Sequence, residues 1–391
     1  MKAREEAVFS KRTAWPADEN PLSRKLAALK KAGHPVLDLT ESNPTRCGFG
    51  YLRQDWLSPL ASSENLLYDP SPRGALAARE AVSRYYARRG ASVDPSQIVL
   101  TASTSEAYHF LFRLLADPDA RILVAKPGYP LLEYLGALND VSVTPFSLKP
   151  DGWSLDLAAL KRAASVKARA LMLVNPNNPT GHFISPGDRE KIVRFCRERS
   201  LALLADEVFF DYAWNPDLRG VSFAAGSETL TFTMSGVSKI LGLPQMKIGW
   251  IAVSGPEKEK REALRRLEII ADAYLSVNTP AQHALPFWLE NAEAVSGEIL
   301  RRVQNNFEAF MKLPEAGRFI KERPQGGWYA AADLPDSRSD EDWALHLLGA
   351  EHVLVHPGYL FDLEGPPQAV ISLLPEPEIF LEGARRILRR L

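Results

Sequence analysis

The feature that most limits how this chain can fold is a regular alternation of short apolar runs and longer amphipathic segments over residues 68–274. The amphipathic segments, such as residues 106–116 and 188–199, have the spacing of helices that bury one face. Apolar strands separated by helices indicate an α/β fold with a mainly parallel, seven-stranded sheet covered on both faces, and its ligand site is expected beyond the carboxyl ends of the strands. The predicted strands are residues 98–101, 121–125, 141–146, 168–174, 201–205, 230–234 and 248–253.

The pattern changes near residue 280. Residues 256–274 are predicted to form one long charged helix, whereas the later segment mixes helical patterns with short strands such as 327–331 and 353–356. The N-terminal segment has too few apolar side chains for a core of its own, so it is expected to pack on the small domain or on a partner subunit. We expect three parts: an arm that also belongs to the small domain (1–45), a large domain (46–279) and a smaller α+β domain (280–391).

The composition excludes several classes of protein. The 47 basic and 48 acidic side chains give a net charge of -1, which provides no reason to expect nucleic acid or a membrane as a partner. The 2 cysteines, Cys47 and Cys196, cannot build a disulfide framework. The charged N-terminus lacks the apolar core of a signal peptide, and no apolar run is long enough to span a membrane. A cytoplasmic protein is therefore expected.

Two ionisable residues follow predicted strands directly. Lys239 comes after strand 230–234 in a turn of small residues, and Asp206 stands after strand 201–205. A lysine amine can form an imine with a carbonyl group, and a carboxylate at this edge can keep a pyridine nitrogen protonated. A solvated lysine and a helix-capping aspartate are the simpler interpretations of either residue alone. Their common place beyond a strand favours a shared site.

Three further segments lie beyond strands. Residues 175–181 (NPNNPTG) form a turn made rigid by two X-Pro steps and a glycine, from which Asn178 can donate a hydrogen bond. The hydroxyl groups of residues 103–105 precede a helix pattern, and such a helix start suits a phosphate, with Lys247 as the countercharge. Tyr129 can stack on a flat ring. Turn formation and helix capping alone would also explain the turn and the hydroxyl groups.

Together these segments resemble those of class I/II aminotransferases, the fold type I pyridoxal-phosphate enzymes. The similarity covers nearly the whole chain in the same order, from Tyr68 to residues 326–329 and 357–358. The resemblance implies that Lys239 forms a Schiff base with pyridoxal 5′-phosphate. It implies that Asp206 pairs with the pyridine nitrogen, that Asn178 pairs with the phenolic oxygen and that Tyr129 stacks on the ring. The phosphate ligands that it implies are Ser103, Thr104, Ser105, Ser238 and Lys247.

The resemblance also implies a homodimer with shared active sites, because Tyr68 of the neighbouring subunit is expected to reach the same phosphate. Lys239, once the substrate amine has displaced it, is expected to move a proton from the substrate Cα to C4′ of the cofactor. The predicted function is therefore an aminotransferase that moves an amino group between a small amino acid and a 2-oxo acid.

Two cofactor positions depart from the family's pattern. Lys247 stands where the family has an arginine, so the charge is kept and the planar fork is lost. Phe209 stands where the family has a tyrosine that donates to the phenolic oxygen, and the loss of that donor is expected to raise the pKa of the Schiff base. Tyr212 is close in sequence and is the candidate to replace it.

The third departure concerns the substrate. Val370 stands two residues before Ser372, where the family has the arginine that binds the substrate α-carboxylate. Arginine binds a carboxylate through two charge-assisted hydrogen bonds, and valine offers none. Arg46 and Asn178 are therefore predicted to contact the substrate, although a surface arginine without this role explains Arg46 equally well.

Other classes of function remain open at this point. The histidines are scattered along the sequence, and only His352 and His356 lie close together, without a nearby cysteine. No metal site is therefore predicted. A dinucleotide site is weakly indicated by residues 48–50 (GFG), which lack a third glycine and a preceding strand. The missing arginine also fits a lyase, a decarboxylase or a cyclising synthase with the same cofactor. A non-enzymatic protein that uses the fold as a scaffold ranks last. Such a protein would be free to lose Lys239, Asp206 and Asn178, and this chain keeps all three.

Overall fold

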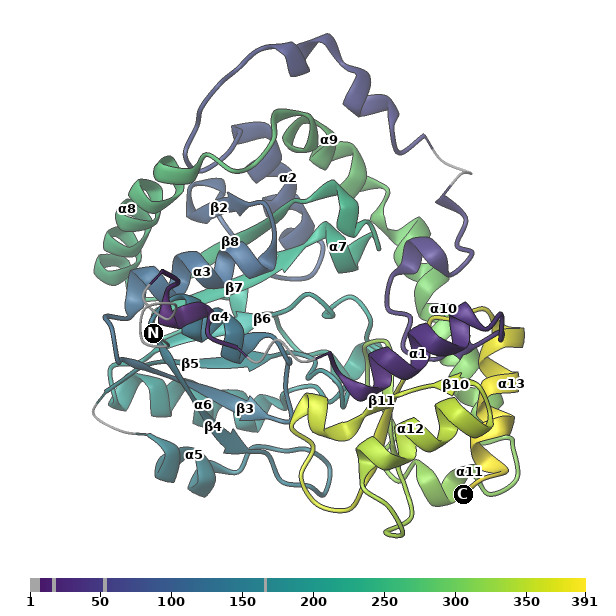
Figure 1. Cartoon of the computed structure of the whole chain (residues 1–391). Coiled ribbons are helices and arrows are strands. Elements are labelled where there is room, and N and C mark those ends of the chain that lie inside the picture. Colours follow the sequence, from purple (N-terminus) through teal and green to yellow (C-terminus); the bar gives the residue numbers. More distant parts are fainter. Residues whose placement is uncertain (1–7, 16–18, 52–54, 165–166) are drawn as a thin grey trace.

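The computed structural model describes residues 8–15, 19–51, 55–164 and 167–391, and a seven-stranded sheet lies at its centre (Figure 1). The strand order is β2-β8-β7-β6-β5-β3-β4, and all neighbouring pairs are parallel except those of β8. The predicted fold class is confirmed. The strands are β2 (Ile98–Thr101), β3 (Arg121–Lys126), β4 (Ser142–Ser147), β5 (Ala168–Val174), β6 (Ala202–Asp206), β7 (Thr231–Gly236) and β8 (Gly249–Ser254).

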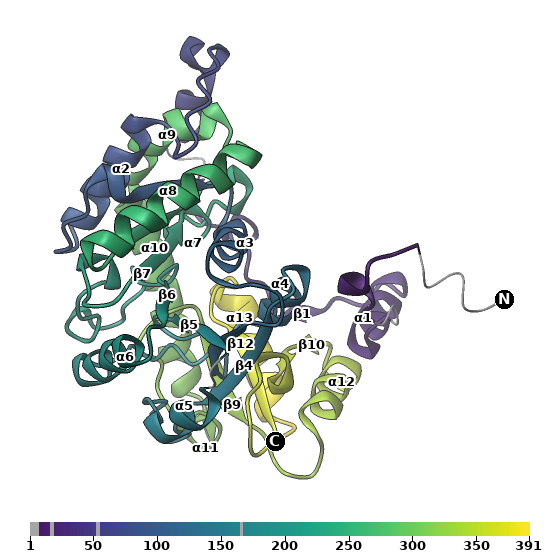
Figure 2. The same cartoon turned by 90° about the vertical axis from the view of Figure 1, so that its left-hand side faces the viewer.

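Helices cover both faces of this sheet (Figures 1 and 2). Successive side chains of a strand point to opposite faces, so each face has its own apolar core. In β5, Met172 packs with α3 and α8, whereas Leu171 packs with α5 and α6 on the other face. The helices of this region are α2 (Leu76–Ala87), α3 (Thr104–Leu115), α4 (Leu132–Leu138), α5 (Leu157–Ala163), α6 (Pro186–Glu198), α7 (Val237–Ile240), α8 (Glu257–Tyr274) and α9 (Thr279–Glu290).

The C-terminal part mixes helices with short strands, as the sequence predicts. Its antiparallel sheet has the order β11-β12-β9, and Val370 of β12 is paired with His356 on one side and Ala331 on the other. Its strands are β9 (Tyr329–Asp333), β11 (His356–Pro357) and β12 (Gln368–Ser372). Its helices are α10 (Ala292–Met311), α11 (Ala316–Phe319), α12 (Asp340–Ala350) and α13 (Pro377–Leu388).

The N-terminal segment lies against this C-terminal part. Helix α1 (Pro21–Lys31) packs on α12, and β1 (Leu37–Asp38) pairs in parallel with β10 (Val353–Leu354). The expected domain boundaries, after residues 45 and 279, stay a prediction. Among the described residues, no helix is both long and apolar enough to cross a membrane.

Candidate active site

A cavity of about 240 Å³ lies at the carboxyl edge of the large sheet. Strands β5, β6 and β7 are parallel, so the residues that follow them meet at this edge. The side chains that line the cavity include six of the predicted site residues: Thr104, Tyr129, Asn178, Asp206, Ser238 and Lys239. Residues far apart in the sequence are thus brought into one site by the order of the strands.

Asp206 is the last residue of β6, and its carboxylate is buried with 6% of its surface exposed. The amide of Val208 donates to Oδ1 at 3.0 Å, and the hydroxyl of Tyr108 donates to Oδ2. Burial raises the pKa of Asp206, whereas the donors Tyr108 and Val208 and the charge of Lys239 lower it. An oriented acceptor therefore faces the cavity from the centre of the sheet.

Lys239 lies on α7, directly after β7. Its Nζ lies 4.8 Å from the ring centroid of Trp328 and 5.4 Å from that of Phe209. Burial lowers the pKa of Lys239 to about 8, and the negative charge of Asp206 opposes this shift. A substantial fraction of this amine is therefore neutral, and nucleophilic, at mildly alkaline pH.

Asn178 lies in the turn after β5. The glycine of this turn, Gly181, has a φ of +71°, and a Cβ there would collide with the carbonyl oxygen of Gly326. Asn177 braces the turn because its Nδ2 donates to the carbonyl of Pro127 at 2.9 Å. The Oδ1 atom of Asn178 is buried and has no hydrogen-bond partner among the described residues. Such an unpaired polar atom is costly unless a ligand satisfies it.

The N-terminus of α3 provides hydrogen-bond donors for an anion. Ser103 caps this helix, and its Oγ accepts from the amide of Glu106 at 3.1 Å. Of the predicted phosphate ligands, Thr104 and Ser238 line the cavity, and Ser105 interacts with the side chain of Tyr129, which also lines it. Lys247 is exposed, has a left-handed backbone with a φ of 50°, and does not line the cavity. Beside the cavity, the helix start rather than Lys247 therefore has the geometry that suits an anion.

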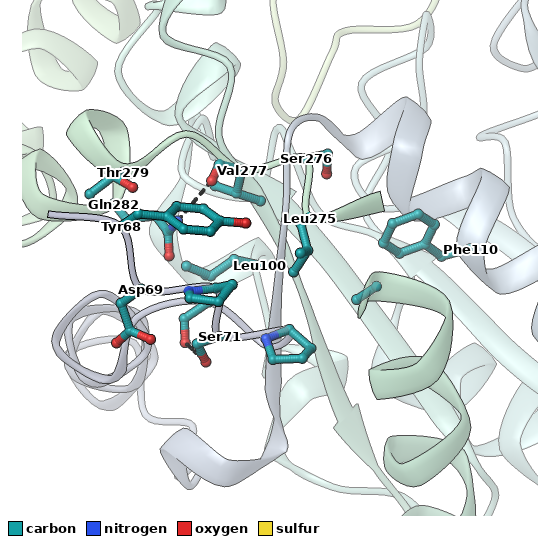
Figure 3. Close-up of a pocket in the computed structure, with 14 residues that line it drawn as sticks. Tyr68, Asp69, Ser71, Leu100, Phe110, Leu275, Ser276, Val277, Thr279 and Gln282 are labelled. Atoms are coloured by element: carbon teal, nitrogen blue, oxygen red, sulfur yellow. Dashed lines mark hydrogen bonds between the residues drawn. The ribbon is translucent and has the colours of Figure 1, made fainter. Parts of the chain in front are cut away.

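Two predicted site residues lie elsewhere. Tyr68 is 76% exposed and borders a separate hollow beside Val277, Thr279 and Gln282, which Figure 3 shows. Arg46 ends the short helix η3 (Pro44–Arg46); its side chain is 75% exposed, and its Nη1 lies 3.9 Å from Glu41. Neither side chain lines the cavity of this chain.

The structure also shows where the residues lie that depart from the family's pattern. Phe209 lines the cavity with its ring. Tyr212 does not take over the missing hydroxyl, because its side chain is buried and its Oη donates to the carbonyl oxygen of Lys239 at 2.6 Å. Val370 is fully buried in β12, and no arginine is among the residues that line the cavity. Among the described residues, no group of three or more His, Cys, Asp or Glu side chains could hold a metal.

Three polar residues that line the cavity were not predicted as site residues from the sequence: Ser42, Tyr108 and Tyr329. A signal for Tyr108 was available, since it follows Ser105 by three residues and so shares its face of α3. Tyr329 belongs to a segment already noted for its resemblance, residues 326–329. Ser42 lies in an irregular loop, and no periodicity could have placed it.

An α/β fold with a neutralisable lysine amine, a buried carboxylate and a helix N-terminus around one cavity suits a class of enzyme that uses a carbonyl cofactor with a phosphate group. Residues 48–376 match the family described as aminotransferase class I and II. The chain therefore belongs to this family, and it is an aminotransferase that depends on pyridoxal phosphate.

Individual proteins give the same result. An alanine aminotransferase of Mycobacterium tuberculosis is 29% identical over 371 residues, which are 91% of this chain and 85% of that protein. The glutamate-pyruvate aminotransferase AlaA of Haemophilus influenzae is 25% identical, with 94% of both chains covered. The structure of an alanine aminotransferase from Pyrococcus furiosus shares the fold, with a TM-score of 0.86, 22% identity and coverage of 98% of this chain and 99% of that chain.

The residues present fit this cofactor. No hydrogen bond within the described residues engages the side chain of Asn178, so its Nδ2 is available to donate to the phenolic oxygen. Asp206 offers an anion to a ring nitrogen, Lys239 offers an amine to a carbonyl group, and the start of α3 offers donors to a phosphate. Each group of the cofactor thus has a matching side chain or helix end.

Proposed function

We propose that the cavity at the sheet edge is the catalytic site, with Lys239 as the covalent attachment point and Asp206 as the partner of the ring nitrogen. The observation that carries this proposal is that one lysine, Lys239, and one carboxylate, Asp206, line the same cavity. Pyridoxal phosphate, when bound, draws into its ring the electrons that a substrate Cα releases on losing its proton.

Lys239 has two tasks in this proposal. Its amine, whose neutral form is favoured by burial, would hold the cofactor through the carbonyl carbon with loss of water. Once the substrate amine has taken its place, Nζ would be the base that accepts the proton of the substrate Cα and the acid that returns it at C4′. The hydrogen bond from Tyr212 to the carbonyl of Lys239 fixes the backbone from which the side chain extends.

The other residues of the site would orient the cofactor and shield it from water. Asp206 would hold a proton on the ring nitrogen of the bound cofactor, and Nδ2 of Asn178 would donate to its phenolic oxygen. Thr104, Ser238 and the first amides of α3 bind the phosphate, with Ser103, Ser105 and Lys247 in the positions that the resemblance gives them. The side chains of Tyr129 and Phe209 line the cavity, and with the cofactor bound their rings would keep water away from these polar contacts and so strengthen them.

The substrates that we propose are a small amino donor of the alanine type and a 2-oxo acid acceptor, because the relatives are named for alanine, glutamate and pyruvate. The test is a panel of amino donors and 2-oxo acids, followed through the absorbance of the bound cofactor. An amino donor is expected to bleach this absorbance, and a 2-oxo acid is expected to restore it. Failure of every donor to produce the cycle would contradict the proposal.

One observation favours a second candidate, a lyase, decarboxylase or cyclising synthase with the same cofactor. No arginine lines the cavity, and Val370 is buried where the family binds the substrate carboxylate. Such an enzyme would release ammonia, carbon dioxide or a cyclised product, and the cofactor absorbance would recover without a 2-oxo acid. The same absorbance experiment therefore separates the two candidates.

We propose that the protein is a homodimer and works in the cytoplasm. A segment with η5 (Ser58–Ala61) and η6 (Ser63–Leu66) projects beyond α9 in Figures 1 and 2. Its apolar side chains Leu66, Leu67 and Tyr68 are 87%, 72% and 76% exposed, which is typical of a surface that a partner covers. Sedimentation should give twice the mass of one chain, and a monomer with full activity would contradict the shared site.

A further inference from the structure

The hydroxyl of Tyr108 makes a contact that the proposed function does not use. It donates to Oδ2 of Asp206, and only 1% of the surface of Tyr108 is exposed. The pKa of Tyr108 is raised well above that of a free phenol, first by burial and then by the charge of Asp206. The phenol therefore keeps its proton and is the donor, so Asp206 is the acceptor.

Asp206 thus receives one donor on each oxygen. Val208 donates its amide to Oδ1 at 3.0 Å, and Tyr108 approaches Oδ2 from α3. A carboxylate oxygen can accept two hydrogen bonds, so each oxygen keeps capacity for the proton of a ring nitrogen. The two donors come from different elements, the start of the loop after β6 and the helix α3, and together they fix the plane of the carboxylate.

The remaining tyrosines around the site have other partners. Tyr212 donates to the carbonyl oxygen of Lys239, whereas Tyr129 and Tyr329 interact with the side chains of Ser105 and Ser42, respectively. Phe209 has no hydroxyl to offer. Among the residues that the structure describes, Tyr108 is the tyrosine whose hydroxyl donates to Asp206, the residue proposed to pair with the ring nitrogen.

We propose that Tyr108 is a positioning residue that sets where the proton between Asp206 and the cofactor's ring nitrogen lies. A donor on Oδ2 makes the carboxylate a weaker base, so the shared proton stays on the ring nitrogen. No atom is gained or lost, since the same proton is distributed between Oδ and nitrogen. This inference rests on the proposed role of Asp206 and adds Tyr108 as the group that tunes it.

Tyr108→Phe removes only the hydroxyl and is the direct test. The proton should move toward Asp206, and the ring should withdraw fewer electrons. We expect kcat to fall about tenfold, the lower limit for a hydrogen bond to a charged group, with KM changed less than about twofold. The decisive readout is the magnetic resonance shift of a nitrogen isotope in the ring of bound pyridoxal phosphate, which should move toward that of a neutral pyridine.

The matched control is Tyr85→Phe. Tyr85 is also buried, and its hydroxyl also donates to a carboxylate, Asp211, at 2.8 Å. Loss of this bond should leave the ring nitrogen signal unchanged even if it lowers stability. A signal that is the same in the Tyr108→Phe enzyme and in wild type would overturn the proposal.

A second measurement uses the cofactor-free protein and does not depend on a well-folded Phe variant. With labelled aspartate carboxyl carbons, the titration of Asp206 should move to lower pH when Tyr108 is replaced with difluorotyrosine, a stronger donor, and an unchanged midpoint would contradict the inference. Borohydride reduction of the loaded wild-type enzyme separates the two levels of proposal. If Lys239 is not labelled, the proposed site itself is wrong, whereas a labelled Lys239 with unmoved signals refutes only the role of Tyr108.

Discussion

The two halves of the cavity follow the family's pattern to different degrees. The cofactor half, formed by Asn178, Asp206, Lys239 and the start of α3, combines the expected residue types at the edge of the large sheet. The substrate half faces the small sheet and the loop around Ser42, and there a buried valine, Val370, stands in place of the expected arginine. We infer that the large parallel sheet holds the residues for the chemistry common to the family, and that the short strands and loops of the other half determine which substrate binds.

The largest effect is expected when the amine of Lys239 is removed from the cofactor half. Lys239→Ala should reduce turnover by on the order of 10³-fold or more, because both the covalent attachment and the proton transfer are lost. Steady-state kinetics on the loaded enzyme measures this effect. Lys258→Ala is the matched control, since Lys258 is exposed on α8 and does not line the cavity. Equal losses in the two variants would contradict the assignment of Lys239.

A second prediction concerns Glu207, the buried neighbour of Asp206, and the effect of its protonation on the free energy of unfolding. Glu207 is 2% exposed, and it accepts from the hydroxyl of Ser222 at 2.5 Å and the amide of Phe223 at 2.9 Å. Burial raises its pKa from 4.5 to about 7, so the folded state favours the protonated form. The resulting stabilisation is complete below pH 4.5 and is lost as the pH rises through 7, by about 3 kcal/mol in total.

Denaturant unfolding at several pH values checks this prediction. The free energy of unfolding should decrease more steeply with pH in wild type than in Glu207→Gln, which cannot ionise. Glu190→Gln, at an exposed position on α6, should keep the wild-type slope. Parallel curves for wild type and Glu207→Gln would show that burial does not hold the proton on Glu207.

Much of the cofactor half could be predicted from the sequence, and the reason is geometric. Residues that directly follow strands of a parallel sheet must meet at one edge, so Asp206 and Asn178 share a site whatever the loops do. The partner of Tyr108 could not be predicted, because the direction of a side chain on α3 depends on how that helix crosses the sheet. The hydroxyl of Tyr212 turned to the carbonyl of Lys239 for the same reason: the local chain path decides which way a buried side chain points.

The prediction for the substrate half is that Arg46 binds the substrate carboxylate. If this arginine turns from Glu41 to a substrate carboxylate, Arg46→Ala should raise KM for the amino donor about tenfold and leave kcat nearly unchanged, since a charge-assisted hydrogen bond is lost. Arg318→Ala is the control, because Arg318 is 78% exposed and forms the same kind of surface ion pair, with Glu315. An unchanged KM would assign carboxylate binding to another group.

The smallest effect predicted here links Lys239 to Asp206. Acetylation of Lys239 in the cofactor-free protein, measured by mass spectrometry of its peptide, should increase with pH through about 8, where the amine becomes neutral. The negative charge of Asp206 raises the pKa of Lys239, so Asp206→Asn should move the midpoint to lower pH. A midpoint that stays in place would mean that the two residues do not interact across the cavity.

The covalent attachment itself can be measured directly. Borohydride reduction of the loaded enzyme, followed by peptide mapping, should place the whole cofactor label on Lys239. A label on Lys247 or any other lysine, or no label in an enzyme that remains active, would contradict the site described here.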